Sequence, residues 1–155
     1  MRNTMKKIKM WPMMLLLAIF FVSCEKEKKE WSLDYGFSTE DVVGSYSNSN
    51  VKGAFDGLAE SAYCRICYDA EVAITNVGGK SRFELKSPNI GFNVSIQGSP
   101  VSNGDGFLLQ MSQSPNELTA YVYTNNASQV RLHGFVRKWK NSDESINYYF
   151  DVIKN

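Results

Sequence analysis

The sequence contains one histidine, His133, and three cysteines among its 155 residues. A single imidazole excludes a metal site built from several histidines. No Gly-x-Ser-x-Gly segment is present to raise a catalytic serine on a sharp turn. General acid–base and nucleophilic catalysis both need a base held beside a reacting group. These absences favour a protein that is not an enzyme, with no cofactor and no metal.

A strong excess of either charge is also missing, since 17 Lys and Arg residues face 16 Asp and Glu residues. Four of the basic residues precede Cys24, and no acidic residue does. The rest of the chain therefore has 13 basic and 16 acidic residues, a net charge of −3. A domain that binds nucleic acid presents a basic face, so the composition excludes a nucleic-acid partner.

The chain has no apolar run long enough to cross a bilayer, which takes about 20 residues. Its longest apolar run, residues 10–22, follows the basic start and precedes a small residue and Cys24. This order of basic, apolar and small residues is typical of a secretory signal. We therefore predict a signal peptide over residues 1–23.

The segment Phe21-Val22-Ser23-Cys24 resembles the lipobox of bacterial lipoproteins, with Phe in place of the usual Leu. The resemblance implies cleavage before Cys24, acylation of its thiol, and anchorage of the mature chain in a membrane. Each buried CH₂ group of the acyl chains would contribute about 0.8 kcal/mol. The alternative is an ordinary secretory signal with a coincidental cysteine.

Residues 25–31 are mostly Glu and Lys and lack apolar periodicity, so residues 24–33 are expected to form a lipidated cysteine and a charged tether. Glu25 is not the Asp that resembles an inner-membrane retention signal. The acidic stretch resembles the surface-export signal of Bacteroidota lipoproteins, although a plain spacer has the same composition. We expect an outer membrane lipoprotein, on the periplasmic face or the cell surface.

Residues 34–155 are expected to form a single β domain, because apolar and polar side chains alternate in eight segments. Separators rich in Gly, Pro, Asn and Ser predict turns between them. Most separators are short, whereas a parallel crossover needs a dozen or more residues. The pattern therefore predicts an antiparallel up-and-down meander. The predicted strands are residues 42–47, 64–75, 82–86, 92–97, 107–112, 118–123, 130–137 and 146–153.

Such a meander fits an eight-stranded barrel better than a sandwich, since sandwiches usually need Greek-key crossings. We expect closure by pairing of residues 42–47 with residues 146–153, giving a barrel or barrel-like sheet. Apolar residues at helical spacing, beginning at Phe55, predict a short helix or a structured loop near residues 54–62. Gly57 weakens the helix by about 1 kcal/mol relative to Ala.

The early segment Val43-Gly44-Ser45-Tyr46, together with the lipobox, the tether and the meander, resembles the small calycin-like (lipocalin-like) lipoproteins of Bacteroidota. The Gly-x-Trp of lipocalins proper is absent. The resemblance implies a barrel fold and binding of a small apolar ligand, but little chemistry, because most such lipoproteins have no established function.

An eight-stranded barrel has an interior that holds its own side chains or one small ligand. One face of each predicted strand points inward, and those side chains are the candidate ligand-binding residues. They are Tyr68, Val72, Phe83, Phe92, Val94, Leu109, Leu118, Val122, Leu132, Tyr148 and Phe150.

Three classes of function remain open. The favoured class is a membrane-tethered, non-enzymatic binding module for a small apolar ligand. The second class is a protein-interaction module, such as an inhibitor or an accessory subunit of a surface complex. The least favoured class is an enzyme. The interior volume separates the first two, because large aromatic side chains at many inward positions could fill the barrel and leave no pocket.

Cys64 and Cys67 form a C-x-x-C segment within a predicted strand. At about 3.3 Å per residue their Cα atoms would lie roughly 10 Å apart, beyond the 7 Å limit for a disulfide. Two unbridged thiols are expected, while a bent segment would allow a disulfide, and redox or metal chemistry is a further alternative. His133 is interpreted as a surface histidine beside Arg131 and Arg137.

The C-terminal third is rich in aromatic side chains, which suit β-sheets through cross-strand pairing. An exposed platform for a glycan or a lipid is the functional alternative, because Tyr and Trp suit half-wet interfaces. Residues 103–106 resemble a calcium-binding loop in composition but lack its ordered ligands, so we predict a turn there.

Overall fold

The computed structural model describes residues 30–102 and 108–155. The predicted signal peptide, Cys24, most of the tether and the turn at residues 103–106 lie outside these residues. Phe107, the first residue of one predicted strand, lies outside them as well.

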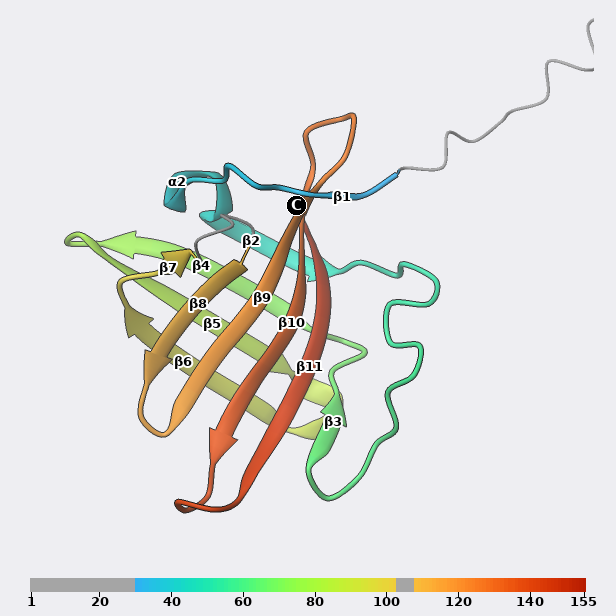
Figure 1. Cartoon of the computed structure of the whole chain (residues 1–155), viewed down its shortest axis with the longest axis vertical. Coiled ribbons are helices and arrows are strands. Elements are labelled where there is room, and N and C mark those ends of the chain that lie inside the picture. The colour runs from blue at the N-terminus through green and yellow to red at the C-terminus, as the bar shows by residue number, and fades with distance from the viewer. Residues whose placement is uncertain (1–29, 103–107) are drawn as a thin grey trace, which may run out of the picture.

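The described residues form an all-β fold, in which one strongly curved sheet wraps around a core (Figure 1). The hydrogen-bonded strand order is β6-β5-β4-β2-β11-β10-β9-β8-β7, with β1 beside β9 and β3 beside β11. Ten strands pair antiparallel, and β3 alone pairs in parallel. The elements are β1 (Ser32–Leu33), α2 (Thr39–Val42), β2 (Gly44–Asn48), β3 (Cys64–Ile66), β4 (Glu71–Val77), β5 (Lys80–Ser87), the 3₁₀ turn η1 (Pro88–Ile90), β6 (Phe92–Gly98), β7 (Val101–Ser102), β8 (Leu108–Gln113), β9 (Asn116–Thr124), β10 (Val130–Trp139) and β11 (Ser145–Lys154).

The predicted meander is confirmed, and so is the pairing of its first and last long strands. In β2, Asn48 lies opposite Val152 of β11, and Tyr46 lies opposite Lys154. All eight predicted segments contain a strand; β3 and β4 both fall in the segment at residues 64–75, and β1 and β7 are short additions.

The sheet is barrel-like and is not closed. Among the described residues its hydrogen-bonded order ends at β6 on one side and β7 on the other, which leaves a seam between β6 and β8. A side chain crosses this seam, since the backbone N–H of Gln97 donates to Oε1 of Gln113 at 2.6 Å. At the seam, β6 and β8 are therefore neighbours that are not joined by a ladder of backbone hydrogen bonds.

The predicted strand at residues 64–75 is wrong in one respect, because a turn divides it into β3 and β4. The Asp69 carboxylate holds this turn against the end of β5, accepting hydrogen bonds from the Ser87 hydroxyl and, at 2.7 Å, from the Asn89 N–H. These bonds hold the pKa of Asp69 below its ordinary value. Because of this turn, β3 is not continuous with β4 and pairs with β11 instead.

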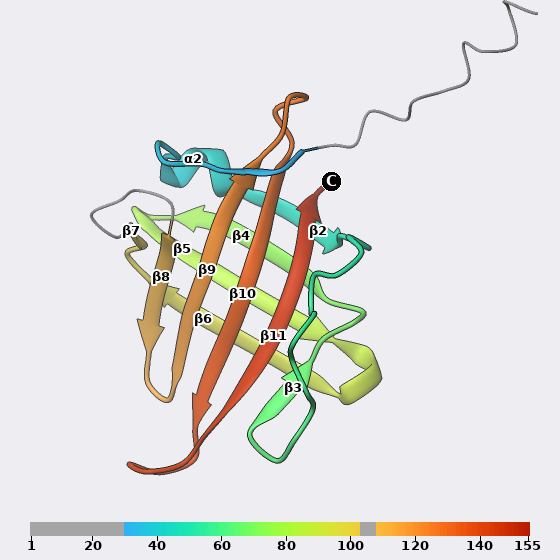
Figure 2. The same ribbon diagram turned by 45° about the vertical axis from the view of Figure 1, so that its right-hand side comes forward.

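No helix forms at residues 54–62, so the structured loop is the correct alternative. Consecutive turns occupy the segment, with the Asp56 N–H donating to the Gly53 oxygen at 3.1 Å. Gly53 and Gly57 have φ of 81° and 83°, in the left-handed region that interrupts a right-handed helix. The connection between β2 and β3 instead runs outside the sheet, beside β11 (Figure 2).

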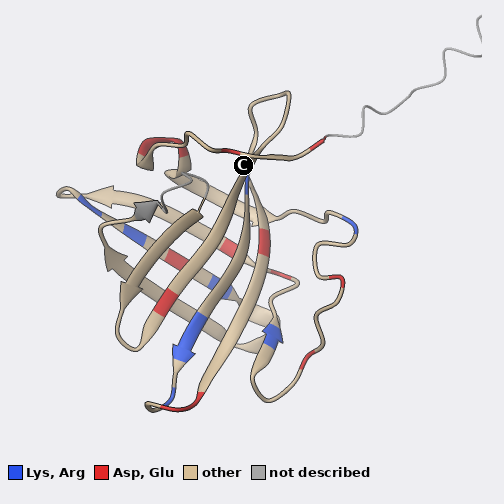
Figure 3. Ribbon diagram, viewed as in Figure 1, with Lys and Arg blue, Asp and Glu red and all other residues tan. Residues whose placement is uncertain are grey.

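The interior face of the sheet forms one continuous apolar core, capped at one end by α2 through Val42. The phenol of Tyr46 reaches this end of the core and donates to the Val42 oxygen at 2.6 Å, and burial raises its pKa. Lys, Arg, Asp and Glu residues are interspersed along the strands (Figure 3), and those in strands are at least partly exposed except Arg131 and Asp151.

At Gly134 the neighbouring strand leaves no room for a side chain. Gly134 lies in β10 between Ala120 of β9 and Phe150 of β11. A Cβ atom at this position would lie 2.1 Å from the Thr119 carbonyl oxygen and 2.5 Å from the Ala120 Cα. The bare glycine thus lets β9 and β10 pack tightly beside the buried Phe150 ring.

Candidate functional site

Ten of the eleven side chains predicted to line the interior do lie in or against the core. Tyr68 does not, because it is 58% exposed in the turn between β3 and β4. The turn ends the alternation that would have pointed it inward, and Cys67 is buried instead. The residues found in or against the core are Val72, Phe83, Phe92, Val94, Leu109, Leu118, Val122, Leu132, Tyr148 and Phe150.

Aromatic rings from opposite walls meet in the middle of this interior. The Phe92 ring of β6 stacks on the Tyr148 ring of β11, with centroids 3.6 Å apart. The Phe83 ring of β5 lies 5.7 Å from the Phe150 ring of β11. β5 and β6 are separated from β11 by β4 and β2 in the sheet order, so these contacts cross the interior. The rings occupy space that a ligand would need.

A buried carboxylate lies on the outer side of the sheet, beneath the connection that follows β2. Asp151 of β11 is fully buried and accepts a hydrogen bond from Arg131 Nε at 2.7 Å and another from the Ser49 hydroxyl. His133 Nδ1 lies 3.3 Å away. Burial disfavours the charged form, but contacts from His133, Arg131 and Ser49 outweigh it and hold the pKa of Asp151 below its ordinary value.

These groups do not form a catalytic triad. In a triad the imidazole lies between the serine and the carboxylate, whereas here the Ser49 hydroxyl donates to Asp151 directly. The His133 ring is partly buried and lies 6.3 Å from the Phe55 ring. It lies on the outer face with Arg131 and Arg137, as predicted, but it is not a plain surface histidine, because its Nδ1 atom is buried beside Asp151. The cluster ties the connection after β2 to the sheet.

A set of aromatic rings and two arginines lies on the outer side of β9, β10 and β11, where Arg131 is buried and Arg137 is partly exposed. The Arg131 guanidinium lies 5.3 Å from the Tyr123 ring and 5.8 Å from the Trp31 ring. The Arg137 guanidinium lies 5.5 Å from the rings of Phe135 and of Trp139. We call this surface the tyrosine–arginine face. Its members are Trp31, Tyr121, Tyr123, Arg131, Phe135, Arg137, Trp139 and Tyr149.

Tyr121 and Tyr123 lie two residues apart in β9 and so share one face, whereas the sequence assigned Trp31 to the tether. β1 pairs with the end of β9, and this pairing brings Trp31 to the sheet. A two-residue strand carries too little alternation to be found from sequence.

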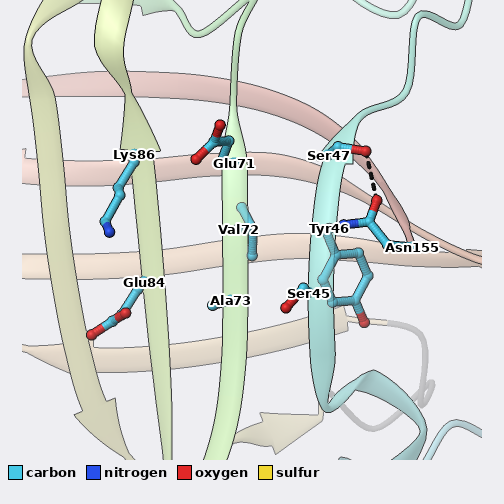
Figure 4. Close-up of a pocket in the computed structure, with 9 residues that line it drawn as sticks. All are labelled: Ser45, Tyr46, Ser47, Glu71, Val72, Ala73, Glu84, Lys86 and Asn155. Atoms are coloured by element: carbon cyan, nitrogen blue, oxygen red, sulfur yellow. Dashed lines mark hydrogen bonds between the residues drawn. The ribbon is translucent and has the colours of Figure 1, made fainter.

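A polar hollow of about 260 Å³ lies on the opposite wall, outside β2, β4 and β5 (Figure 4). Ala73 forms part of its floor, and the carboxylates of Glu71 and Glu84 and the amine of Lys86 surround it. The Ser47 hydroxyl donates to Asn155 Oδ1 at 2.7 Å on the far side. The side chains that project into it are polar or small, so it offers no aromatic wall to a ligand.

A second hollow of about 400 Å³ lies where the connection after β2 meets the turn at Tyr68. Phe55 and Tyr68 form an aromatic wall, and Asn48, Asn50 and Asp56 contribute polar groups. This site combines residues from two irregular segments, so periodicity gave no sign of it.

Cys64 and Cys67 are free thiols, as expected. Burial raises the pKa of Cys67 to about 11, and partial burial also raises the pKa of Cys64. A reactive cysteine needs a lowered pKa, because the thiolate is the nucleophile. The pair is therefore a poor redox centre.

Within residues 30–102 and 108–155, no group of three or more His, Cys, Asp or Glu side chains is placed to hold a metal ion. The same residues include no helix with the length and apolar character needed to cross a membrane. No family model, curated protein or solved structure matches the chain.

Proposed function

We propose that the protein is a membrane-tethered, non-enzymatic interaction module that binds a partner protein through its tyrosine–arginine face. The observation that carries this proposal is the placement of the aromatic side chains. Rings inside the sheet contact one another across the core, as Phe92 and Tyr148 do, while further rings gather outside around Arg131 and Arg137.

The composition of the tyrosine–arginine face suits protein recognition. Trp, Tyr and Arg are the residues most enriched at the energetic centres of interfaces. Arg137 Nε donates to Asn147 Oδ1 at 3.2 Å, but its ion pair is loose, since the guanidinium lies 3.8 Å from the Glu117 carboxylate and both side chains are partly exposed. A partner that offers apolar groups to the rings and a carboxylate to Arg137 fits this surface. An inhibitor or an accessory subunit of a surface complex would bind in this way.

An apolar ligand in the interior is the other function suggested by the family resemblance. It would require the stacked rings of Phe92 and Tyr148 to separate. We therefore expect native mass spectrometry of protein purified from its own host to show the chain without a co-purified apolar molecule. A bound apolar molecule that survives purification would favour the interior site instead.

To test the proposed face, a photo-crosslinking amino acid is placed at Tyr121, an exposed position beside β10. We expect one crosslinked protein partner from cells of the host, and Arg137→Glu should weaken its capture about tenfold, an effect typical of a central interface residue. The matched control carries the same photo-crosslinker at Arg82, an exposed position on β5. Equal products from both positions, or capture unchanged by Arg137→Glu, would contradict the proposal.

The membrane tether is tested at Cys24. Cys24→Ala removes the thiol that acylation needs, so we expect the variant to lose lipid labelling and to remain unprocessed. Cys64→Ala is the control, because it removes a thiol from the β domain and should leave lipid labelling and membrane partition intact. A Cys24→Ala chain that is still cleaved, labelled with lipid and extracted with membranes would show that the lipobox assignment is wrong.

A further inference from the structure

The hollow at Tyr68 has the size and the mixed lining of a small-molecule site. Its volume of about 400 Å³ falls within the range of about 300–1,000 Å³ usual for such sites. It is formed by the connection after β2 and by the turn between β3 and β4, outside the core. It shares no residue with the tyrosine–arginine face.

The aromatic wall of this hollow is held in place before any ligand arrives. The Phe55 ring meets the Tyr68 ring edge-on, at 5.5 Å and 83°. Behind Phe55 lies the His133 ring, which is itself next to the buried Asp151. On the other side, the Asn48 amide donates to the Tyr68 carbonyl oxygen. The exposed ring therefore has a fixed backbone and a fixed neighbour, which lowers the entropy lost on binding.

The polar groups of the hollow have bonding capacity left over. Asn50 accepts a hydrogen bond from Asn48 at 3.2 Å, and its own amide N–H groups make no bond to another described residue. The Asp56 carboxylate makes no hydrogen bond or ion pair to another described residue and lies close over Gly53. A Cβ atom at Gly53 would lie 2.9 Å from Asp56 Oδ2, so only glycine lets the carboxylate sit there undisturbed.

This combination suits a ligand that carries hydroxyl groups. A carboxylate accepts hydrogen bonds and an amide group donates them, so together they match hydroxyl groups, which do both. An aromatic face, with its negative π surface, suits the weakly positive C–H groups of a sugar ring. Anions are disfavoured, because Asp56 is the one charged side chain that lines the hollow. A purely apolar ligand would leave the carboxylate and the amides without partners.

We infer that the Tyr68 hollow binds a neutral sugar, such as a terminal hexose of a glycan. The sugar ring stacks on Tyr68, and its hydroxyl groups bond to Asp56 and Asn50. This inference goes beyond the proposed function, because it concerns a different ligand at a different surface.

The test uses the purified full chain and the methyl α- and β-glycosides of glucose, galactose and mannose. Saturation-transfer NMR should detect binding of at least one glycoside, with a Kd in the millimolar range. Tyr68→Ala should weaken that binding about tenfold through loss of the stacked ring. Tyr63→Ala is the matched control, since Tyr63 is 57% exposed, nearly the same as Tyr68, but does not line the hollow. It should leave the affinity within about twofold.

Two further variants keep the result interpretable if Tyr68→Ala disturbs folding. Tyr68→Phe keeps the ring and should keep most of the binding, while Asp56→Asn should weaken it without changing the fold, because the carboxylate has no partner among the described residues. Absence of saturation transfer to all six glycosides, or equal affinity in the wild type and Asp56→Asn, would overturn the inference. Crosslinking at Tyr121 is independent of all these outcomes, so either proposal can fail alone.

Discussion

Replacing Asp151 with alanine is expected to lower the free energy of unfolding by about 3–5 kcal/mol, the usual cost of breaking a buried ion pair. The variant would leave the Arg131 guanidinium almost fully buried without its carboxylate. It would also remove the side-chain acceptor of the Ser49 hydroxyl and so weaken the attachment of the connection that covers β11, which would keep the bond from the Ser49 N–H to the Asp151 carbonyl oxygen. Urea unfolding followed by circular dichroism measures the change.

The exposed Glu71→Ala is the matched control and should change the free energy of unfolding by less than about 0.5 kcal/mol. A double variant, Arg131→Met with Asp151→Leu, removes both charges and should recover much of the loss. A loss below about 1 kcal/mol in Asp151→Ala would show that the ion pair is not what holds this part of the fold.

The same carboxylate gives the stability a defined pH dependence. The pKa of Asp151 in the folded chain lies below its ordinary value of 3.8, so the folded state favours the ionised form. Its contribution is therefore fully present above pH 3.8 and is lost as the pH falls through the folded-state pKa. The Asp151→Ala variant should lack this part of the acid destabilisation.

Gly134→Ala is the second change with a large expected effect, near the upper end of the 1–3 kcal/mol that overpacking costs, about 3 kcal/mol. The added methyl group would meet the backbone of β9, at the Thr119 oxygen and the Ala120 Cα, and neither can rotate away. Strands β9 and β10 would have to separate. Thermal unfolding should show a lower midpoint, and hydrogen exchange should be faster along these two strands.

Gly98→Ala is its control on another strand. A Cβ atom there meets only the Ser112 oxygen, at an ordinary contact distance of 3.6 Å. This variant should stay within about 0.5 kcal/mol of the wild type. If the two variants were equally stable, the close approach at Gly134 would not be a constraint on the fold.

Alternation of apolar and polar residues was enough to predict the meander and the pairing of β2 with β11. It failed at Tyr68 because the local pattern continues through a turn. From Cys64 to Ala70 every second residue is apolar or aromatic, just as in a strand. The turn depends on hydrogen bonds from Ser87 and Asn89 to Asp69. Because these partners are distant in the chain, the sequence around Asp69 does not reveal the turn.

The contact of Asp151 with His133 could have been predicted from the register of the last two long strands. The hairpin of β10 and β11 places His133 directly opposite Asp151. That register predicts a contact between the imidazole and the carboxylate. The burial of the pair has a different origin, because it depends on the connection after β2, whose path is set by positive-φ residues such as Gly53 and Gly57. The Tyr68 hollow depends on the same path, so it could not be predicted from the sequence pattern either.

The position of β11 in the sheet has a consequence for the order of events during folding. β11 is the last described strand, yet β2, β3 and β10 all pair with it. A chain that is synthesised N-terminus first exposes the edge of β2 until nearly the whole domain has followed. Until β11 arrives, no native partner covers that edge. The final strand thus completes the sheet. A chain that stops before β11 has emerged would remain an open, protease-sensitive intermediate.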